Sequence, residues 1–183
     1  MFELQTHRLR LIALDAENLR LSLENPQRMV DNLGLERYTS APQGELRAAV
    51  EQMLAGVLRD EANYLWYTHW QIVLKEQNDI IGGFCFKGPP GAKGQVEIGY
   101  GIEPSHQGKG YMSESLAEIL RWALAQPGVS AVVAETSKSN AASHAVLRKV
   151  GFAPYREAPD CLWWRISTPV HGAQSRSEVN KGH

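Results

Sequence analysis

The sequence predicts a single α/β domain, of the α+β kind, in which helices flank a mixed and mostly antiparallel sheet. Short apolar runs typical of strands are interspersed with longer segments whose apolar residues recur at helical spacing. Hairpin-like connections rich in glycine and proline join several of the strands. We see no internal repeat or linker in the 183 residues, and a chain of this length is typical of one domain.

The strand-like segments either alternate in polarity or are apolar throughout. Leu9, Leu11 and Ala13 share one face of the first segment, whereas residues 129–136 have the apolar character of a strand buried on both faces. The final two segments can pair as a hairpin. The expected strands are 7–14, 71–75, 80–87, 95–102, 129–136, 152–157 and 162–167.

Helix signals lie between these strands. Asp15 can cap a helix that runs through Glu24, and Asn25-Pro26 begins a short second helix. An apolar stripe at helical spacing follows, and we interpret it as a core face rather than a partner surface. The stripe consists of Leu46, Ala49, Val50, Met53, Leu54 and Val57.

Two later helices complete the predicted domain. One begins near residue 110 and ends at Pro127-Gly128, and the other is capped by Ser139 or Asn140 and stops at Gly151. In brief, the predicted order is β-α-α-β-β-β-α-β-α-β-β. We expect residues 1–168 to form the domain and residues 169–183, which are polar and aperiodic, to form a mobile tail.

The composition argues against several classes of function. The chain is 43% hydrophobic and 21% charged, and its net charge of −1 argues against a broad surface for nucleic acids or anionic membranes. No apolar run approaches the roughly 20 residues of a membrane span, and the N-terminus is too polar for a signal peptide. We therefore expect a cytoplasmic protein. Cys85 and Cys161 lack the spacing of metal ligands, so we expect free thiols and no metal site.

The stretch from residue 95 to residue 112 carries the strongest chemical signal. Its first half is a buried strand that Pro104 ends, and Gly108 and Gly110 then expose the backbone where a helix begins. The first amides of a helix have no intrahelical partner and lie at the positive end of the helix dipole, which suits a phosphate. The stretch therefore predicts a site for a pyrophosphate-bearing cofactor.

A glycine-rich turn of this kind is a weak signal alone. A P-loop requires lysine and then serine or threonine after its last glycine, and Gly110 is followed by Tyr111-Met112 instead. A dinucleotide fingerprint requires a third glycine, where this chain has Ser113. Neither fingerprint is met.

A second motif makes the signal specific. The sequence Gln-Gly-Lys-Gly-Tyr-Met at residues 107–112 is followed about 28 residues later by Asn-x-x-Ser-x-x-Val-Leu-x-Lys-x-Gly-Phe, at residues 140–152. This pair resembles the GNAT acetyltransferase superfamily, and its wording is most similar to the RimJ/RimL-like branch of N-acetyltransferases. The resemblance covers about residues 4–167. It implies a GNAT fold and acetyl-CoA-dependent transfer to an amine.

By this resemblance, the amides of residues 108–112 hold the acetyl-CoA pyrophosphate and the pantetheine arm binds along the end of the strand at 95–102. Gly99 and Gly101 would allow that close approach, although a simple bulge explains them equally well. Asn140 is interpreted both as a cofactor contact and as a helix cap. The implied cofactor-binding residues are Ile102, Gln107, Gly108, Lys109, Gly110, Tyr111, Met112 and Asn140.

Transfer to an amine requires that the amine is neutral. A lysine, with a reference pKa of about 10.4, is almost wholly protonated at pH 7, whereas an α-amine near about 8 is partly neutral. Glu97 is the candidate general base, with a structural carboxylate as the alternative. The resemblance implies that Ser143 donates to the departing thiolate, with helix packing as the alternative. Leu147 replaces the tyrosine acid that many relatives carry on the late helix.

The acceptor is the least determined part of the hypothesis. Tyr38, Trp66, Trp70 and Trp163 are candidates for an aromatic substrate wall, although we favour strand packing for the aromatic residues at 63–70. The RimJ/RimL likeness favours a protein N-terminal α-amine, with a small-molecule amine as the alternative. A catalytically idle CoA-binding module is a third possibility. Relatives of this branch are often monomers or homodimers, and we expect one of these states.

Overall fold

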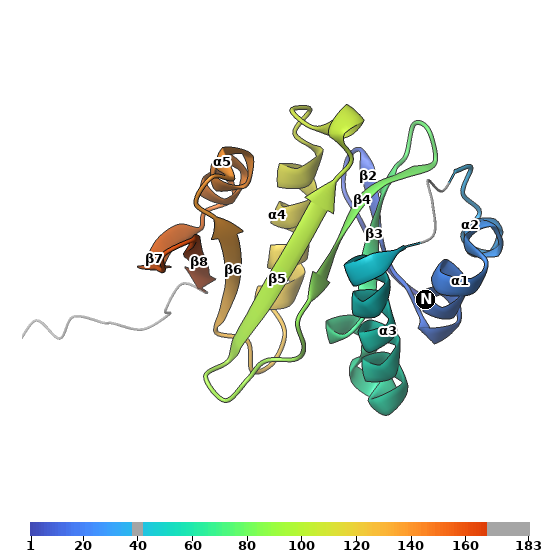
Figure 1. Ribbon diagram of the computed structural model, residues 1–183, viewed down its shortest axis with the longest axis horizontal. Helices are drawn as coiled ribbons and strands as arrows, with labels where there is room; N and C mark the ends of the chain where they lie inside the picture. Colours follow the sequence, from blue (N-terminus) through green and yellow to red (C-terminus); the bar gives the residue numbers. More distant parts are fainter. Residues whose placement is uncertain (38–41, 168–183) are drawn as a thin grey trace, which may run out of the picture.

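The computed structural model describes residues 1–37 and 42–167. Within this part of the chain, one eight-stranded sheet has the order β1-β2-β3-β4-β5-β6-β8-β7. Neighbouring strands are antiparallel except for β5 and β6, which are parallel (Figure 1). The predicted fold class is therefore confirmed. The strands are β1 (Phe2–Gln5), β2 (Leu9–Ala13), β3 (His69–Leu74), β4 (Asp79–Phe86), β5 (Gln95–Ile102), β6 (Ala131–Ser137), β7 (Ala153–Glu157) and β8 (Cys161–Ser167).

The helices begin at the residues that the sequence marks as caps. The Asp15 carboxylate accepts a hydrogen bond from the Asn18 amide at 3.0 Å, and the Asn25 side chain accepts one from the Arg28 amide at 3.2 Å. Both predicted caps are confirmed. The helices are α1 (Ala16–Glu24), α2 (Pro26–Leu33), α3 (Gly44–Arg59), α4 (Tyr111–Leu124) and α5 (Ala141–Lys149), with short 3₁₀ helices η1 (Glu61–Trp66) and η2 (Pro104–His106).

Two hydrophobic cores lie on opposite faces of the sheet. Leu11 and Ile12 are neighbours on β2 and both are fully buried, but Leu11 packs in the core beneath α4 and Ile12 in the core beneath α1, α2 and α3. Helix α4 lies behind the sheet in Figure 1 and α3 in front of it. Because α1, α2 and α3 pack on the strands at one end, the two faces of β5 and β6 have different surroundings.

The structure differs from the predicted order in two places. Strand β1 precedes the first predicted strand, and three α-helices separate β2 from β3 where the predicted order has two. The third, α3, carries the predicted apolar stripe at 46–57, which that order does not count. A four-residue edge strand is too short to show a clear alternation, which is why β1 was missed. The predicted tail at 169–183 lies outside the described residues.

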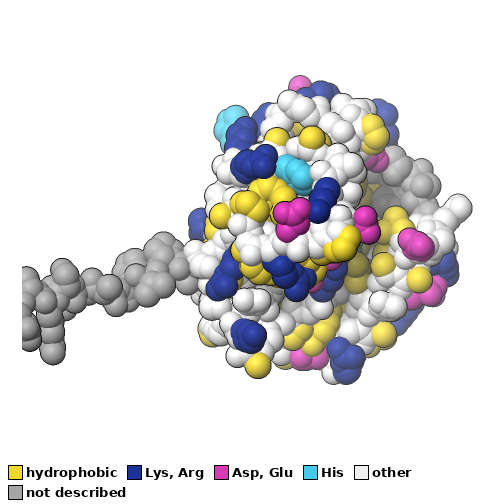
Figure 2. All heavy atoms as spheres, turned by 60° about the vertical axis from the view of Figure 1, so that its left-hand side comes forward, with side chains coloured by type: hydrophobic (Ala, Val, Ile, Leu, Met, Phe, Trp, Pro, Cys, Tyr) yellow, Lys and Arg dark blue, Asp and Glu magenta, His cyan; other side chains and the backbone are white. Residues whose placement is uncertain are grey.

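The surface that carries α5, β7 and β8 is mixed in character. Figure 2 shows Lys and Arg side chains interspersed with acidic and hydrophobic ones on this side of the molecule. Strand β7 is the outer edge of the sheet, and its residues are all exposed. No helix in the part of the chain that the structure describes is long and apolar enough to cross a membrane.

Candidate active site

The parallel strands β5 and β6 separate along their length. Residues 95–97 of β5 pair with residues 131–133 of β6, and the pairing ends there although β5 continues to Ile102 and β6 to Ser137. The edge of β5 beyond Glu97 is therefore not covered by β6. An extended ligand with amide groups can bind such an edge as an added strand.

A cavity of about 470 Å³ occupies the opening between these strands. Its walls come from the end of β5, the turn before α4, the start of α4, and one face of α5, from which Lys149 adds a positive charge. Every predicted cofactor-binding residue except Lys109 lines this cavity. The predicted residues that line it are Ile102, Gln107, Gly108, Gly110, Tyr111, Met112 and Asn140.

The turn before α4 has the backbone conformation that glycine favours. Gly108 has φ +72° and Gly110 has φ +82°, both in the left-handed region. Gly110 is the N-cap of α4 and provides no side chain, so no side-chain hydrogen bond caps the helix. The first amides of α4 thus face the cavity uncapped, as an anion-binding site requires.

Asn140 caps α5, which is one of its two expected roles. Its side-chain oxygen accepts a hydrogen bond from the Ser143 amide at 3.0 Å and caps α5. Because Asn140 also lines the cavity, the cap places it beside the expected ligand. Contact with the cofactor stays a prediction.

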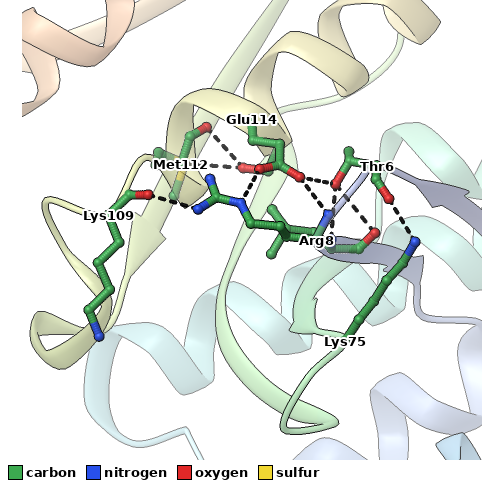
Figure 3. Close-up of polar contacts among 8 residues, drawn as sticks. Thr6, Arg8, Lys75, Lys109, Met112 and Glu114 are labelled. Carbon is green, nitrogen blue, oxygen red and sulfur yellow. Dashed lines mark hydrogen bonds and ion pairs between the residues drawn. The ribbon is translucent and has the colours of Figure 1, made fainter.

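A cluster of polar side chains contacts the turn before α4 and the first turn of that helix (Figure 3). Arg8, just before β2, binds the Glu114 carboxylate through its Nε at 2.7 Å and donates from Nη1 to the Lys109 carbonyl at 3.1 Å. Its guanidinium also lies 4.4 Å from the centre of the Tyr111 ring. Thr6 donates a further hydrogen bond to Glu114. We call Thr6, Arg8 and Glu114 the Arg8 cluster; it ties the N-terminal strands to the turn.

The Arg8 cluster also fixes the charge of Glu114. Burial alone would raise the pKa of this carboxyl group, but hydrogen bonds from Thr6 and Arg8, together with the Arg8 charge, lower the pKa below its usual value. Glu114 is therefore ionised at neutral pH. The negative charge holds the Arg8 guanidinium against the turn.

Replacing Arg8 by alanine is expected to weaken acetyl-CoA binding by roughly three- to tenfold, because the turn loses one hydrogen bond and one cation–π contact. Titration calorimetry measures the change. Arg10→Ala is the matched control, since Arg10 loses a similarly exposed ion pair with Glu3 but has no contact with the turn. Equal affinities for the two variants would show that Arg8 does not support the turn.

A second cavity, of about 870 Å³, lies on the face of the sheet that carries α3. Its floor is formed by β3, β4 and β5. Its apolar wall consists of part of the stripe expected to be core: Leu46, Ala49, Val50 and Met53. Leu46 is 59% exposed, so the core interpretation is wrong for this residue, whereas Val50 is buried and belongs to the core. It holds for Val57, which is buried beneath the helix.

The two cavities share a wall. Tyr100, Gly101 and Ile102, at the end of β5, line both of them. Neither Gly99 nor Gly101 has any atom within 4 Å of the place where a Cβ would lie. The α3 face of β5 is therefore bare of side chains at Gly99 and Gly101, and a ligand in one cavity can approach a ligand in the other at this end of the strand.

Tyr100 brings a buried hydroxyl group to this shared wall. Its oxygen has no hydrogen-bond partner among the described residues. Burial raises the pKa of Tyr100, and the nearby Ser143 side chain acts in the opposite direction, although the two groups do not form a complete hydrogen bond. The phenol is thus protonated at neutral pH and able to donate.

Comparison with known proteins agrees with this geometry. The family model described as "Acetyltransferase (GNAT) domain" matches residues 8–153. The chain is a GNAT acetyltransferase. Among curated relatives, the uncharacterized N-acetyltransferase YjdG of Bacillus subtilis is 29% identical over 164 residues, which cover 90% of this chain and 97% of the relative.

Solved structures share the fold at lower identity. The ribosomal-protein-S5-alanine acetyltransferase of Vibrio fischeri matches with a TM-score of 0.68 at 15% identity, over 91% of this chain and 97% of that one. RimL, a ribosomal L7/L12 α-N-protein acetyltransferase in complex with coenzyme A, matches with a TM-score of 0.65 at 17% identity, over 91% and 98%. The predicted likeness to the RimJ/RimL branch is confirmed at the level of the superfamily and the fold.

The two predicted catalytic residues lie in different surroundings within this GNAT domain. Ser143 lines the first cavity near Tyr100. Glu97 is the last residue of β5 that pairs with β6, and it forms an ion pair with Lys87 on the α3 face of the sheet. Because of that pair the pKa of Lys87 is raised. Glu97 is two residues before Gly99, which lines the second cavity.

Two of the four predicted acceptor residues are buried. Trp70 is fully buried against Phe84 and Trp122, and Trp66 is 7% exposed and packs on Phe86 and Trp122. Both indoles face α4, on the side of the sheet away from the second cavity. Trp66 and Trp70 therefore do not form a substrate wall. The strand-packing interpretation is correct for Trp70 on β3, whereas Trp66 packs in the same core from η1.

The other two acceptor candidates are not brought to the cavities. Trp163 lies on β8 with the Arg156 guanidinium 4.4 Å from its ring centre, and it lines neither cavity. Tyr38 lies outside the described residues. The predicted aromatic wall is therefore not assembled in the described part of the chain.

Sequence reasoning missed the polar residues of the second cavity. His69 and Gln71 flank Trp70 on β3 and point into the cavity, because successive side chains of a strand face opposite sides. The alternation of polar and apolar residues in this strand is visible in the sequence. The prediction used the aromatic residues, which face α4, rather than the polar ones, which face the cavity. Tyr100 was missed because its importance depends on two cavities that only the fold brings together.

The lowered pKa of His69 predicts that the stability of the fold depends on pH. Burial lowers its pKa to about 4 from an ordinary value of 6.5, so between these values the unfolded chain binds more protons. Stability is expected to fall as pH drops through this window, by roughly 2 kcal/mol at pH 5 from this residue. Thermal melts of the wild type and His69→Gln from pH 7 to pH 4 check this. Parallel curves would contradict the prediction.

No group of three His, Cys, Asp or Glu side chains within residues 1–37 and 42–167 is arranged to hold a metal ion. The two cysteines are free thiols.

Proposed function

We propose that this protein is an acetyl-CoA-dependent N-acetyltransferase that moves an acetyl group to a primary amine by direct attack. The observation that carries the proposal is the wall shared by the two cavities at Tyr100, Gly101 and Ile102. The first cavity suits a phosphate-bearing thioester and the second suits an acceptor. Direct transfer requires that two ligands meet, and the end of β5, where Gly99 and Gly101 have no side chains, is where they can.

In this proposal the amides at the start of α4 bind the diphosphate of acetyl-CoA. The uncovered edge of β5, up to Ile102, binds the pantetheine arm. Support comes from the cavity and from membership of the GNAT family, and RimL, a structural neighbour, was solved with coenzyme A. Lys109 contributes its backbone to the turn, and its side chain is exposed.

The transfer forms one bond and breaks another. The amine nitrogen attacks the thioester carbon, the N–C bond forms, and the C–S bond breaks to release a thiolate that takes up a proton. Ser143 and Tyr100 are the hydroxyl donors near that sulfur position. Leu147 is fully buried in the core, so the acid that relatives carry on the late helix is supplied in this proposal by Tyr100, from the opposite wall.

Glu97 is the proposed base, acting on the amine directly or through a water. Replacing Glu97 by glutamine should lower turnover and shift its pH dependence, because the amine loses its proton acceptor. Steady-state rates from pH 6 to pH 9 measure both effects. An unchanged profile would leave Glu97 only the structural role that its ion pair with Lys87 suggests.

The favoured acceptor is a protein N-terminal α-amine. An α-amine has a lower pKa than a lysine side chain and so requires less of a base. The named structural neighbours act on ribosomal proteins, which adds weight to this choice. A small-molecule amine is the second candidate, because a cavity of about 870 Å³ is also of the size that encloses small ligands.

The test is a product assay with a panel of peptides and small amines. Each acceptor is incubated with the protein and acetyl-CoA, and both free CoA thiol and acetylated amine are quantified. Equal amounts of the two products with any acceptor would support the proposal. Acetyl-CoA binding without product from any acceptor would favour the catalytically idle CoA-binding module.

A further inference from the structure

The floor of the second cavity carries a polar pair on β3. His69 and Gln71 project from β3, and the Gln71 Nε2 lies 3.1 Å from the His69 Nδ1. An amide nitrogen can only donate, so Nδ1 accepts the hydrogen bond. Burial lowers the pKa of His69 to about 4, and the ring is neutral at pH 7. Its single proton is therefore on Nε2.

The Cε1–Nε2 edge of the His69 ring lies over Gly83 on the next strand, β4. A Cβ atom added to Gly83 would lie 2.6 Å from the Cε1 and Nε2 atoms of the ring. Gly83 is paired with Gln71 on one side and with Gly101 on the other. The imidazole thus reaches over β4 toward β5, which is about 5 Å farther on. Only a glycine at position 83 leaves space for the ring in this place.

Beyond the ring, the surface of β5 is open. Gly99 and Gly101 present no side chains, and both line the cavity. His69 is half-buried and lines the cavity, and its Nε2–H has no hydrogen-bond partner among the described residues. It is therefore a donor at the edge of an open floor, about one strand away from the wall that the two cavities share. A group that accepts this hydrogen bond would hold the rest of its molecule beside that wall.

The other residues that line the second cavity indicate which kind of amine it can bind. The wall formed by Leu46, Ala49, Val50 and Met53 is apolar. Glu103 is the only described lining residue with a formal charge at pH 7, because His69 is neutral. A polycationic amine would leave most of its charges without a partner in such a cavity.

We propose that His69 is a specificity-determining residue that donates from Nε2 to an oxygen next to the reacting amine, and that the acceptor is an α-amino carbonyl compound with an apolar side chain. Gln71 is a positioning residue, which holds the proton on Nε2. This inference rests on the proposed function, since it identifies the second cavity as the amine site. It adds the residues that recognise the acceptor and the side chain that the acceptor carries.

The test compares two amines that share an isobutyl group. Leucinamide has a carbonyl oxygen beside its amine, and 3-methylbutylamine does not. Their dissociation constants are measured by NMR titration of the CoA-saturated protein, so that no acetyl transfer is needed. We expect tighter binding of leucinamide, and His69→Phe should reduce this preference roughly three- to tenfold, as expected for one lost hydrogen bond.

Three further measurements sharpen the result. Gln71→Met should reduce the same preference, because the ring loses the partner that fixes its tautomer. His144→Phe is the control, since His144 bonds to Thr136 and lines neither cavity. Glycinamide should bind less tightly than leucinamide, because it has no side chain to place against the α3 wall.

The inference and the proposed function can fail separately. The inference is overturned if His69→Phe weakens the binding of leucinamide and of 3-methylbutylamine by the same factor. It is also overturned if the wild type binds a diamine such as putrescine more tightly than leucinamide. Either result would count even if acetyl transfer occurs. A His69-dependent preference without any acetylated product would support the inference and contradict the proposed reaction.

Discussion

Tyr100→Phe is expected to lower the turnover number by about a hundredfold, at the lower end of the range for loss of a general acid. The hydroxyl is buried at the wall that the two cavities share, where we propose that the thioester and the amine meet. It has no hydrogen-bond partner among the described residues, so it is free to donate to the leaving group. Burial raises the pKa of Tyr100, so the donor stays protonated at neutral and mildly alkaline pH. Acetyl-CoA affinity should change little, because the ring is kept. Steady-state kinetics and calorimetry measure the two quantities.

Tyr64→Phe provides the control for removal of a partly buried tyrosine hydroxyl. The Tyr64 oxygen accepts a hydrogen bond from the Phe2 amide at 3.1 Å, and the residue lines neither cavity. Its loss should lower stability by about 1 kcal/mol without an effect on turnover. If Tyr100→Phe retains the turnover of the wild type, Tyr100 does not protonate the leaving group and Ser143 is the donor to examine next.

Gly108→Val is expected to weaken acetyl-CoA binding at least about tenfold, since a left-handed conformation costs an L-residue 1–2 kcal/mol and a β-branched side chain more. Gly108 has φ +72°, and no atom lies within 4 Å of the position of its Cβ. The penalty is therefore conformational rather than steric. Any relaxation of the turn moves the amides at the start of α4 away from the diphosphate.

Gly34→Val separates this effect from loss of stability. Gly34 ends α2 at φ +63°, also has open space around its Cβ position, and lines neither cavity. Both variants should unfold at lower temperatures by similar amounts, but only Gly108→Val should lose affinity for acetyl-CoA. Equal affinities in calorimetry would mean that the turn at Gly108 does not bind the cofactor.

The parts of the fold that depend on local chemistry were predictable from the sequence. Asp15 and Asn25 cap their helices as expected, and Gly108 and Gly110 adopt the conformation for which glycine is needed. The cofactor residues cluster because they are close in the chain or belong to two motifs on adjacent helices. Capping and glycine conformations are local properties, so a sequence pattern can reveal them.

The parts that depend on distant contacts were not predictable. Arg8 and Glu114 are 106 residues apart and meet only because β2 passes the start of α4. Trp70 and His69 are neighbours, but which of them faces the second cavity depends on which face of β3 each helix covers. An alternating pattern shows that a strand has two faces and leaves open which face carries the site.

The most direct test of this account is a calorimetric titration of the purified protein with acetyl-CoA, followed by the Gly108→Val variant under the same conditions. The account predicts saturable one-to-one binding by the wild type, competition by coenzyme A, and weaker binding by the variant. No binding by the wild type, or equal binding by both proteins, would contradict the assignment of the opening between β5 and β6 as the acetyl-CoA site.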